Sequence, residues 1–154
     1  MLDRGWLKRT LDVEGPDLVR TFALWRLSQL RLGAARMLHA RELLTDGLRA
    51  GSSDRFAELC STALLARHPS EGFASFDPLN AVDSMRATML TASLFEQIRD
   101  RFDDDWWRNP RTGAFLHKRF TLGGFETTEQ IVSSHGDEKS TLCRWTQRLE
   151  RLLV

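Results

Sequence analysis

The sequence lacks tyrosine altogether and has few cysteines, prolines and lysines among its 154 residues. The two cysteines, Cys60 and Cys143, are far apart and belong to no pairing or metal motif, so we expect reduced thiols. No apolar run approaches the roughly 18 residues of a membrane span, which excludes a membrane partner. The first ten residues, MLDRGWLKRT, lack the apolar core of a signal peptide, and we therefore expect a cytoplasmic location.

Neither sign of charge is in clear excess. The net charge is +1, and the 22 basic residues are interleaved with 21 acidic residues along the chain. A nucleic-acid-binding protein usually carries a concentrated basic patch, and this pattern is typical of solvated helix faces instead. We expect no nucleic-acid partner.

The patterns that the sequence does contain predict an all-α protein. Residues 1–154 are expected to form a single-domain bundle of about six helices, two of them long, because no segment shows the alternation of a strand. The first long helix is predicted over 16–46, with Pro16 in a favoured first-turn position and a tolerated Gly33 inside it. Its apolar residues fall on two sides. The first side holds Leu18, Phe22, Trp25 and Leu32, and the second holds Ala23, Leu27, Leu30, Ala34, Met37 and Leu38.

The remaining helices are marked by start and stop signals. A helix over 54–67 is predicted, with Ser53 as its N-cap and Pro69 after its end, followed by a loop. Pro78 precedes the second long helix, predicted over 79–102. Shorter helices are predicted over 110–122, 127–134 and 140–153.

The stretch RDRFDDDWWRNPRTGAFL allows three interpretations. Asp103–Asp105 could cap a helix while Trp106 and Trp107 anchor the corner between two helices, with Asn109 and Pro110 restarting the chain. A hard-cation site or an exposed stacking platform are the alternatives. We favour the corner, because three consecutive carboxylates cannot all face one ion in a helix and no histidine is nearby. At least one tryptophan is then expected to be buried.

Catalytic motifs are missing. None of the four histidines belongs to an H-E-x-x-H zinc motif, and no G-x-S-x-G or phosphate-binding loop is present. His39 and Glu42 are three residues apart on the first long helix, which predicts a pair on the helix surface in preference to a metal site. We predict no catalytic residue, no metal ligand and no cofactor.

Three segments nevertheless resemble a known family. FALWRLSQLRLGAARMLHARELL, residues 22–44, is similar to a long helix near the C-terminal end of zinc metallopeptidases of the thimet oligopeptidase and oligoendopeptidase F type. Residues 77–116 resemble the family's acidic-Pro turn, R-A-x-M-L-x-A helix, Trp-Trp pair and N/S-P-x-x-G-x-x-L segment, and GFETTEQIVSSHG resembles its terminal helical hairpin. The matching positions in residues 77–116 are Arg86, Ala87, Met89, Leu90, Ala92, Arg101, Phe102, Trp106, Trp107, Pro110, Gly113 and Leu116.

The chain lacks the residues that carry out catalysis in this family. The zinc helix and the further glutamate ligand lie N-terminal to the matching region in the family and are missing here. The tyrosines that stabilise the developing oxyanion in the family are also missing, since the corresponding stretch DPLNAVDS has none. The resemblance therefore implies a helical scaffold without peptidase activity of its own, and zinc only if a separate catalytic half supplies the site.

Two further hypotheses remain beside the scaffold. The chain could be a stand-alone interaction module that forms a homo-oligomer, or one half of a zinc metallopeptidase completed in trans by a separate peptidase half. A candidate groove or interface for either partner consists of Trp25, Leu32, Arg86, Trp106 and Trp107.

Overall fold

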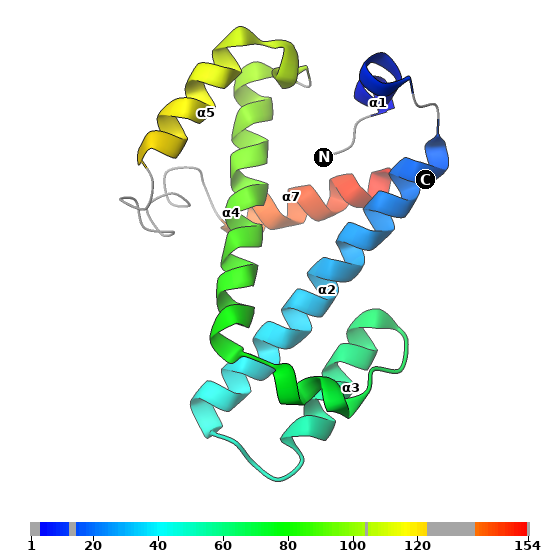
Figure 1. Ribbon diagram of the computed structural model, residues 1–154, viewed down its shortest axis with the longest axis vertical. Helices are drawn as coiled ribbons and strands as arrows, with labels where there is room; N and C mark the ends of the chain where they lie inside the picture. Colours follow the sequence, from blue (N-terminus) through cyan, green and yellow to red (C-terminus); the bar gives the residue numbers. More distant parts are fainter. Residues whose placement is uncertain (1–3, 13–14, 104, 123–137, 154) are drawn as a thin grey trace. The chain divides into compact units, whose positions relative to one another are not determined.

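The protein is all-α, as predicted. The computed structural model describes residues 4–12, 15–103, 105–122 and 138–153, and none of these residues lies in a strand (Figure 1). None of their helices is long and apolar enough to cross a membrane. The α-helices are α1 (Arg4–Leu11), α2 (Pro16–Asp46), α3 (Ser52–Leu64), α4 (Pro78–Phe102), α5 (Pro110–Leu122) and α7 (Glu138–Arg151). Two 3₁₀ turns, η1 (Ser70–Ser75) and η2 (Trp106–Arg108), lie between them.

The predicted helices agree closely with the observed ones. The bounds of α2 and α5 are as predicted, α4 begins one residue earlier, and α2 continues unbroken through Gly33. α3 is shifted, beginning at Ser52 and ending at Leu64 because Leu65 adopts a left-handed conformation with φ 54°. α1 was not predicted, and η1 occupies the predicted loop. The predicted helix over 127–134 lies outside the described residues.

The chain divides into two compact units. The first comprises Met1–Met85 with Thr146–Val154, and the second comprises Arg86–Trp145, so the boundaries fall inside α4 and α7.

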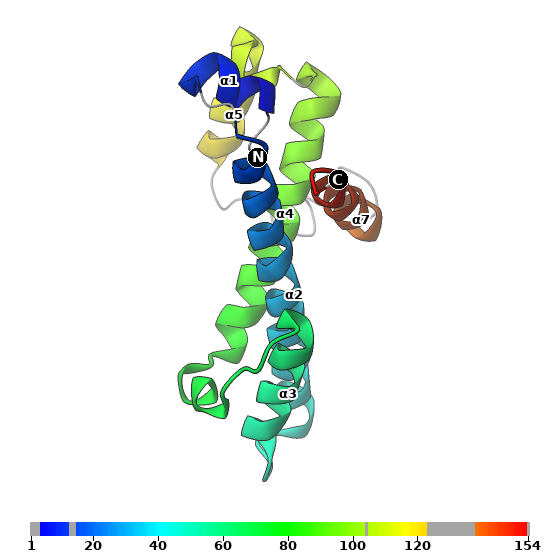
Figure 2. The ribbon, with the colours of Figure 1, turned by 90° about the vertical axis from the view of Figure 1, so that its right-hand side faces the viewer.

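The first unit is built on a hairpin of α2 and α3. Figures 1 and 2 show α3 beside the second half of α2. Gly47 and Gly51 make the turn, both with the positive φ that glycine adopts without strain. At 1.5 Å per residue, α2 is roughly 46 Å long and α3 roughly 20 Å, so α3 can cover only about half of α2.

An aromatic cluster fills the closed side of this hairpin. Phe56 of α3 is fully buried, and its ring centroid lies 4.9 Å from that of Phe76 and 5.8 Å from that of Phe73. His39 of α2 lies 5.5 Å from each of these three rings. The segment after Pro69, which was predicted as a loop, therefore supplies two of the rings that enclose His39.

In the second unit, the corner between α4 and α5 differs from the prediction in its capping. α4 ends at Phe102, and the next residue, Asp103, has φ 62° and donates its N–H to the carbonyl of Arg99. Asp105 precedes η2, but its side chain does not cap that turn. The cap of α5 comes from Asn109, whose Oδ1 accepts a hydrogen bond from the N–H of Arg111 at 3.1 Å. The predicted capping by the aspartates is therefore wrong for Asp105, and Asp104 lies outside the described residues.

The two tryptophans at this corner are both half-buried. Their ring centroids lie 6.0 Å apart in an edge-to-face arrangement. Neither Trp106 nor Trp107 is fully buried, so the expectation of at least one buried ring is wrong. The packing at this corner comes instead from Phe102, which is buried and lies 5.5 Å from the ring of Phe115.

Candidate functional site at the α2–α3 turn

The five candidate interface residues are divided between the two units. Trp25 and Leu32 lie on α2 in the first unit, where Trp25 is 52% exposed and Leu32 is half-buried. Arg86 is exposed near the middle of α4, whereas Trp106 and Trp107 follow the end of that helix. Arg86 and the helix end are 16 residues, or roughly 24 Å, apart along α4.

Sequence reasoning placed the most unusual side chain of the first unit, His39, on the helix surface, but the structure buries it. It is 1% exposed, and neither ring nitrogen makes a hydrogen bond within the described part of the chain. Nδ1 lies 3.5 Å from Oε2 of Glu42, which is longer than a well-formed hydrogen bond. A buried polar group left in this state costs about 1–3 kcal/mol.

This finding corrects the predicted surface pair. His39 and Glu42 do approach each other as their spacing indicated, but only Glu42 reaches the surface. The burial of His39 depends on Phe56, Phe73 and Phe76, which belong to α3 and the segment after it. In the described residues, no group of three or more His, Cys, Asp or Glu side chains could hold a metal ion.

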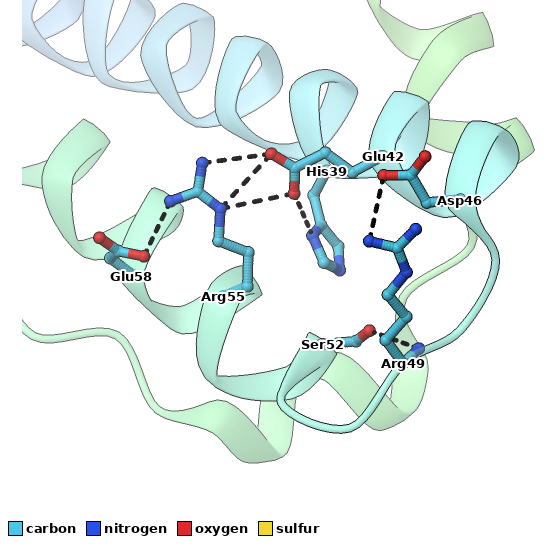
Figure 3. A network of polar contacts seen from close by, with 7 residues as sticks. All are labelled: His39, Glu42, Asp46, Arg49, Ser52, Arg55 and Glu58. Carbon is cyan, nitrogen blue, oxygen red and sulfur yellow. Dashed lines mark hydrogen bonds and ion pairs between the residues drawn. The ribbon is translucent and has the colours of Figure 1, made fainter.

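Glu42 belongs to a charged network that joins α2 to α3. Figure 3 shows Arg55 of α3 between two carboxylates. Nη2 of Arg55 lies 3.1 Å from Oε1 of Glu42, and Nη1 lies 2.8 Å from Oε2 of Glu58. The hydrogen bonds from Arg55 hold the pKa of Glu42 below its ordinary value, with smaller contributions from the charge of Arg55 and from His39. Glu42 therefore remains ionised at neutral pH.

A pocket of about 280 Å³ opens at the turn beside this network. Its lining combines His39 with both ion pairs of the turn, Glu42–Arg55 and Asp46–Arg49, and with Gly47 and residues 50–52. The N-cap residue of α3 is Gly51, which offers no side chain to the first-turn amides of that helix. The pocket thus contains a helix N-terminus and a buried imidazole.

A second polar pocket, of about 470 Å³, lies within the second unit. Its lining includes Arg101, Arg119 and Arg144 together with Glu96 and Asp100. The lining thus carries charges of both signs, and the guanidinium carbons of Arg101 and Arg119 lie 5.2 and 6.0 Å from the centre of the Phe115 ring. Because Glu96 is buried and two arginines pack on one ring, these contacts indicate a structural cluster.

The first half of α2 presents an apolar surface. Leu18, Phe22, Trp25 and Leu32 recur at heptad spacing, and the same spacing leads on to His39 in the second half. His39 contacts Phe56 of α3, so this face of α2 is the one that α3 covers. On the first half the face is open, with Leu18 45% and Trp25 52% exposed.

No protein-family model, curated protein or solved structure matches the chain.

Proposed function

We propose that this protein is a non-catalytic helical scaffold of the oligopeptidase type that associates through the first half of α2. Its partner in this proposal is a second copy of the chain. The observation that carries the proposal is that one face of α2 is covered by α3 in its second half and left open at Leu18 and Trp25, with the half-buried Phe22 between them.

The open face has the chemistry of an association surface. Phe22 and Trp25 lie in contact, with ring centroids 5.8 Å apart, and aromatic side chains supply much of the binding energy of protein interfaces. A symmetric pair of chains would cover the stripe on both copies at once, and two-fold dimers are the commonest soluble oligomers. We do not expect peptide hydrolysis by the chain alone, since it has neither the H-E-x-x-H motif nor a tyrosine.

Sedimentation equilibrium at micromolar concentration tests the proposal. The wild-type chain should show a mass approaching twice 17.7 kDa, and Trp25→Glu should weaken the dimer by placing a charge in the contact. Leu44→Glu is the control, because Leu44, like Trp25, is an exposed apolar residue of α2 but lies away from the stripe.

Two results would contradict the dimer. One is a monomer mass across the concentration range, and the other is equal weakening by both substitutions. A monomer that forms a stable complex with a separately encoded protein containing H-E-x-x-H would favour the split peptidase instead.

A further inference from the structure

His39 gives the pocket at the α2–α3 turn a buried, unused hydrogen-bonding group. The side chain is 1% exposed, it lines the pocket, and its Nε2 has no hydrogen-bond partner within the described part of the chain. Figure 3 shows the ring between the Arg55 and Arg49 side chains. Nδ1 faces Glu42, and the other nitrogen is turned toward the side of Arg49 and Ser52.

The charged groups around His39 come from three segments. Of the charged residues that line the pocket, Glu42 and Asp46 belong to α2, Arg49 to the turn, and Arg55 to α3, so these four formal charges cancel. Beyond the lining, Glu58 lies 2.8 Å from Arg55, and the guanidinium of Arg36 lies 5.8 Å from the ring of Phe76, so this second pair of charges also cancels. On the remaining side, His68 lies beyond Phe56, with its ring centroid 5.6 Å from that of Phe56. A proton on His39 would therefore make the pocket net positive.

The positive end of α3 adds to this preference. The first-turn amides of a helix point outward and favour an anion, and Gly51 supplies no side-chain cap, although the N–H of Ser52 already donates to the carbonyl of Arg49 at 3.1 Å. The guanidinium of Arg49 lies 3.6 Å from Asp46, and the arginine side chain is 68% exposed. Arg49 can therefore turn from this exposed ion pair toward a ligand. Such exposed pairs contribute little stability and are readily exchanged.

We propose that this pocket binds a small oxyanion, of carboxylate or of sulfate and phosphate type, together with a proton on His39. The imidazolium then donates Nδ1–H to Glu42 and Nε2–H to the anion, while Arg49 and the first turn of α3 complete the site. The volume of about 280 Å³ is below the usual range for drug-sized ligands, so the ligand is a small ion or the end group of a larger molecule. This inference is independent of self-association.

The test is an NMR titration of the full chain with sodium sulfate and, separately, with sodium acetate, at constant ionic strength. Sulfate keeps its charge between pH 6 and 8, so a change in its affinity reports on the protein. We expect saturable shifts at the amides of residues 51–54 and at the His39 ring, with binding at pH 6 tighter than at pH 8 by up to about a hundredfold, because the uptake of one proton on binding changes the affinity by at most tenfold per pH unit. The anion that binds more tightly identifies the type of oxyanion.

Two variants and their controls complete the experiment. His39→Phe should abolish the response, and His117→Gln, which removes an exposed histidine of α5, should leave it unchanged. If His39→Phe does not fold, Arg49→Gln should weaken binding, while Arg41→Gln removes the same charge from an exposed position of α2 outside the pocket.

Three outcomes would overturn the proposal: no saturable shift, binding that strengthens as the pH rises, or equal binding by His39→Phe. A saturable response to methylammonium in place of the anions would also overturn it, since it would assign the pocket to cations.

Discussion

Arg55 of α3 and Glu42 of α2 join the two helices of the hairpin, with 3.1 Å between Nη2 and Oε1. The same arginine lies 2.8 Å from Glu58 one turn further along α3. Glu42 in turn lies 3.5 Å from the buried ring of His39. The ion pair thus connects the surface of the hairpin with its aromatic core, and its loss should be detectable in the stability of the fold.

Glu42→Gln should make the protein less stable at pH 7 and less sensitive to acid. A carboxyl whose pKa is lowered by folding contributes stability above its unfolded value, here near 4.5, and loses that contribution as the pH falls through the lowered value. Urea midpoints of the two proteins should therefore differ most above pH 5 and converge below pH 4. The difference should be small and should shrink in high salt, because the network is roughly half exposed.

The control for this series is Glu71→Gln, which removes an exposed carboxylate of η1 outside the network. It should leave the pH profile unchanged. If the difference between wild type and Glu42→Gln persists undiminished at pH 3, the ion pair is not its source.

Trp106→Ala and Trp107→Ala should each have a moderate effect. Both rings are half-buried, so each substitution should cost about 1–2 kcal/mol, compared with about 3–5 kcal/mol for a fully buried ring. Phe102→Ala is the comparison, since Phe102 is buried at the same corner and should cost more. Urea unfolding measures the loss of stability for all three substitutions. If a tryptophan substitution costs more than Phe102→Ala, the tryptophans contribute most of the packing at this corner.

Asn109→Ala should destabilise α5 by about 1 kcal/mol, the usual cost of losing a helix cap. Its side-chain oxygen accepts the hydrogen bond from Arg111, and Asp at this position would retain that acceptor. Asn109→Asp should therefore have near wild-type stability in the same urea series. Equal destabilisation by Ala and Asp would show that the amide group of Asn109 has another role.

Much of the fold was predictable because its boundaries are local. Pro16 and Pro110 mark the first residues of their helices, and a proline needs only its own fixed φ to favour a first turn. The end of α3 was not predictable, because Leu65 adopts a left-handed conformation that its own propensity disfavours. α1 was not predictable either, because a helix of only eight residues is not stable without tertiary packing.

The site was less predictable than the fold. The spacing of His39 and Glu42 correctly indicated that they approach each other, since residues three apart share a helix face. The burial of His39 depends on Phe73 and Phe76, which are more than 30 residues further along the chain. No local pattern in a sequence specifies such a contact, and η1, which includes Phe73, was predicted as a loop.

The two cysteines should differ sharply in reactivity. Cys60 is buried in α3, and desolvation raises the pKa of its thiol, with Arg36 opposing this weakly. Cys143 is exposed on α7. Because the thiolate is the reactive form, a raised pKa and burial both slow modification.

A disulfide reagent such as Ellman's should therefore label Cys143 rapidly in the native protein at pH 8, and Cys60 only as the chain unfolds. Cys143→Ser should remove the rapid phase and leave the slow one. Adding urea to the unfolding midpoint should merge the two phases, because Cys60 then reacts through the unfolded population. A rapid phase that survives Cys143→Ser would mean that Cys60 is reached without unfolding, and that the α2–α3 hairpin opens readily in solution.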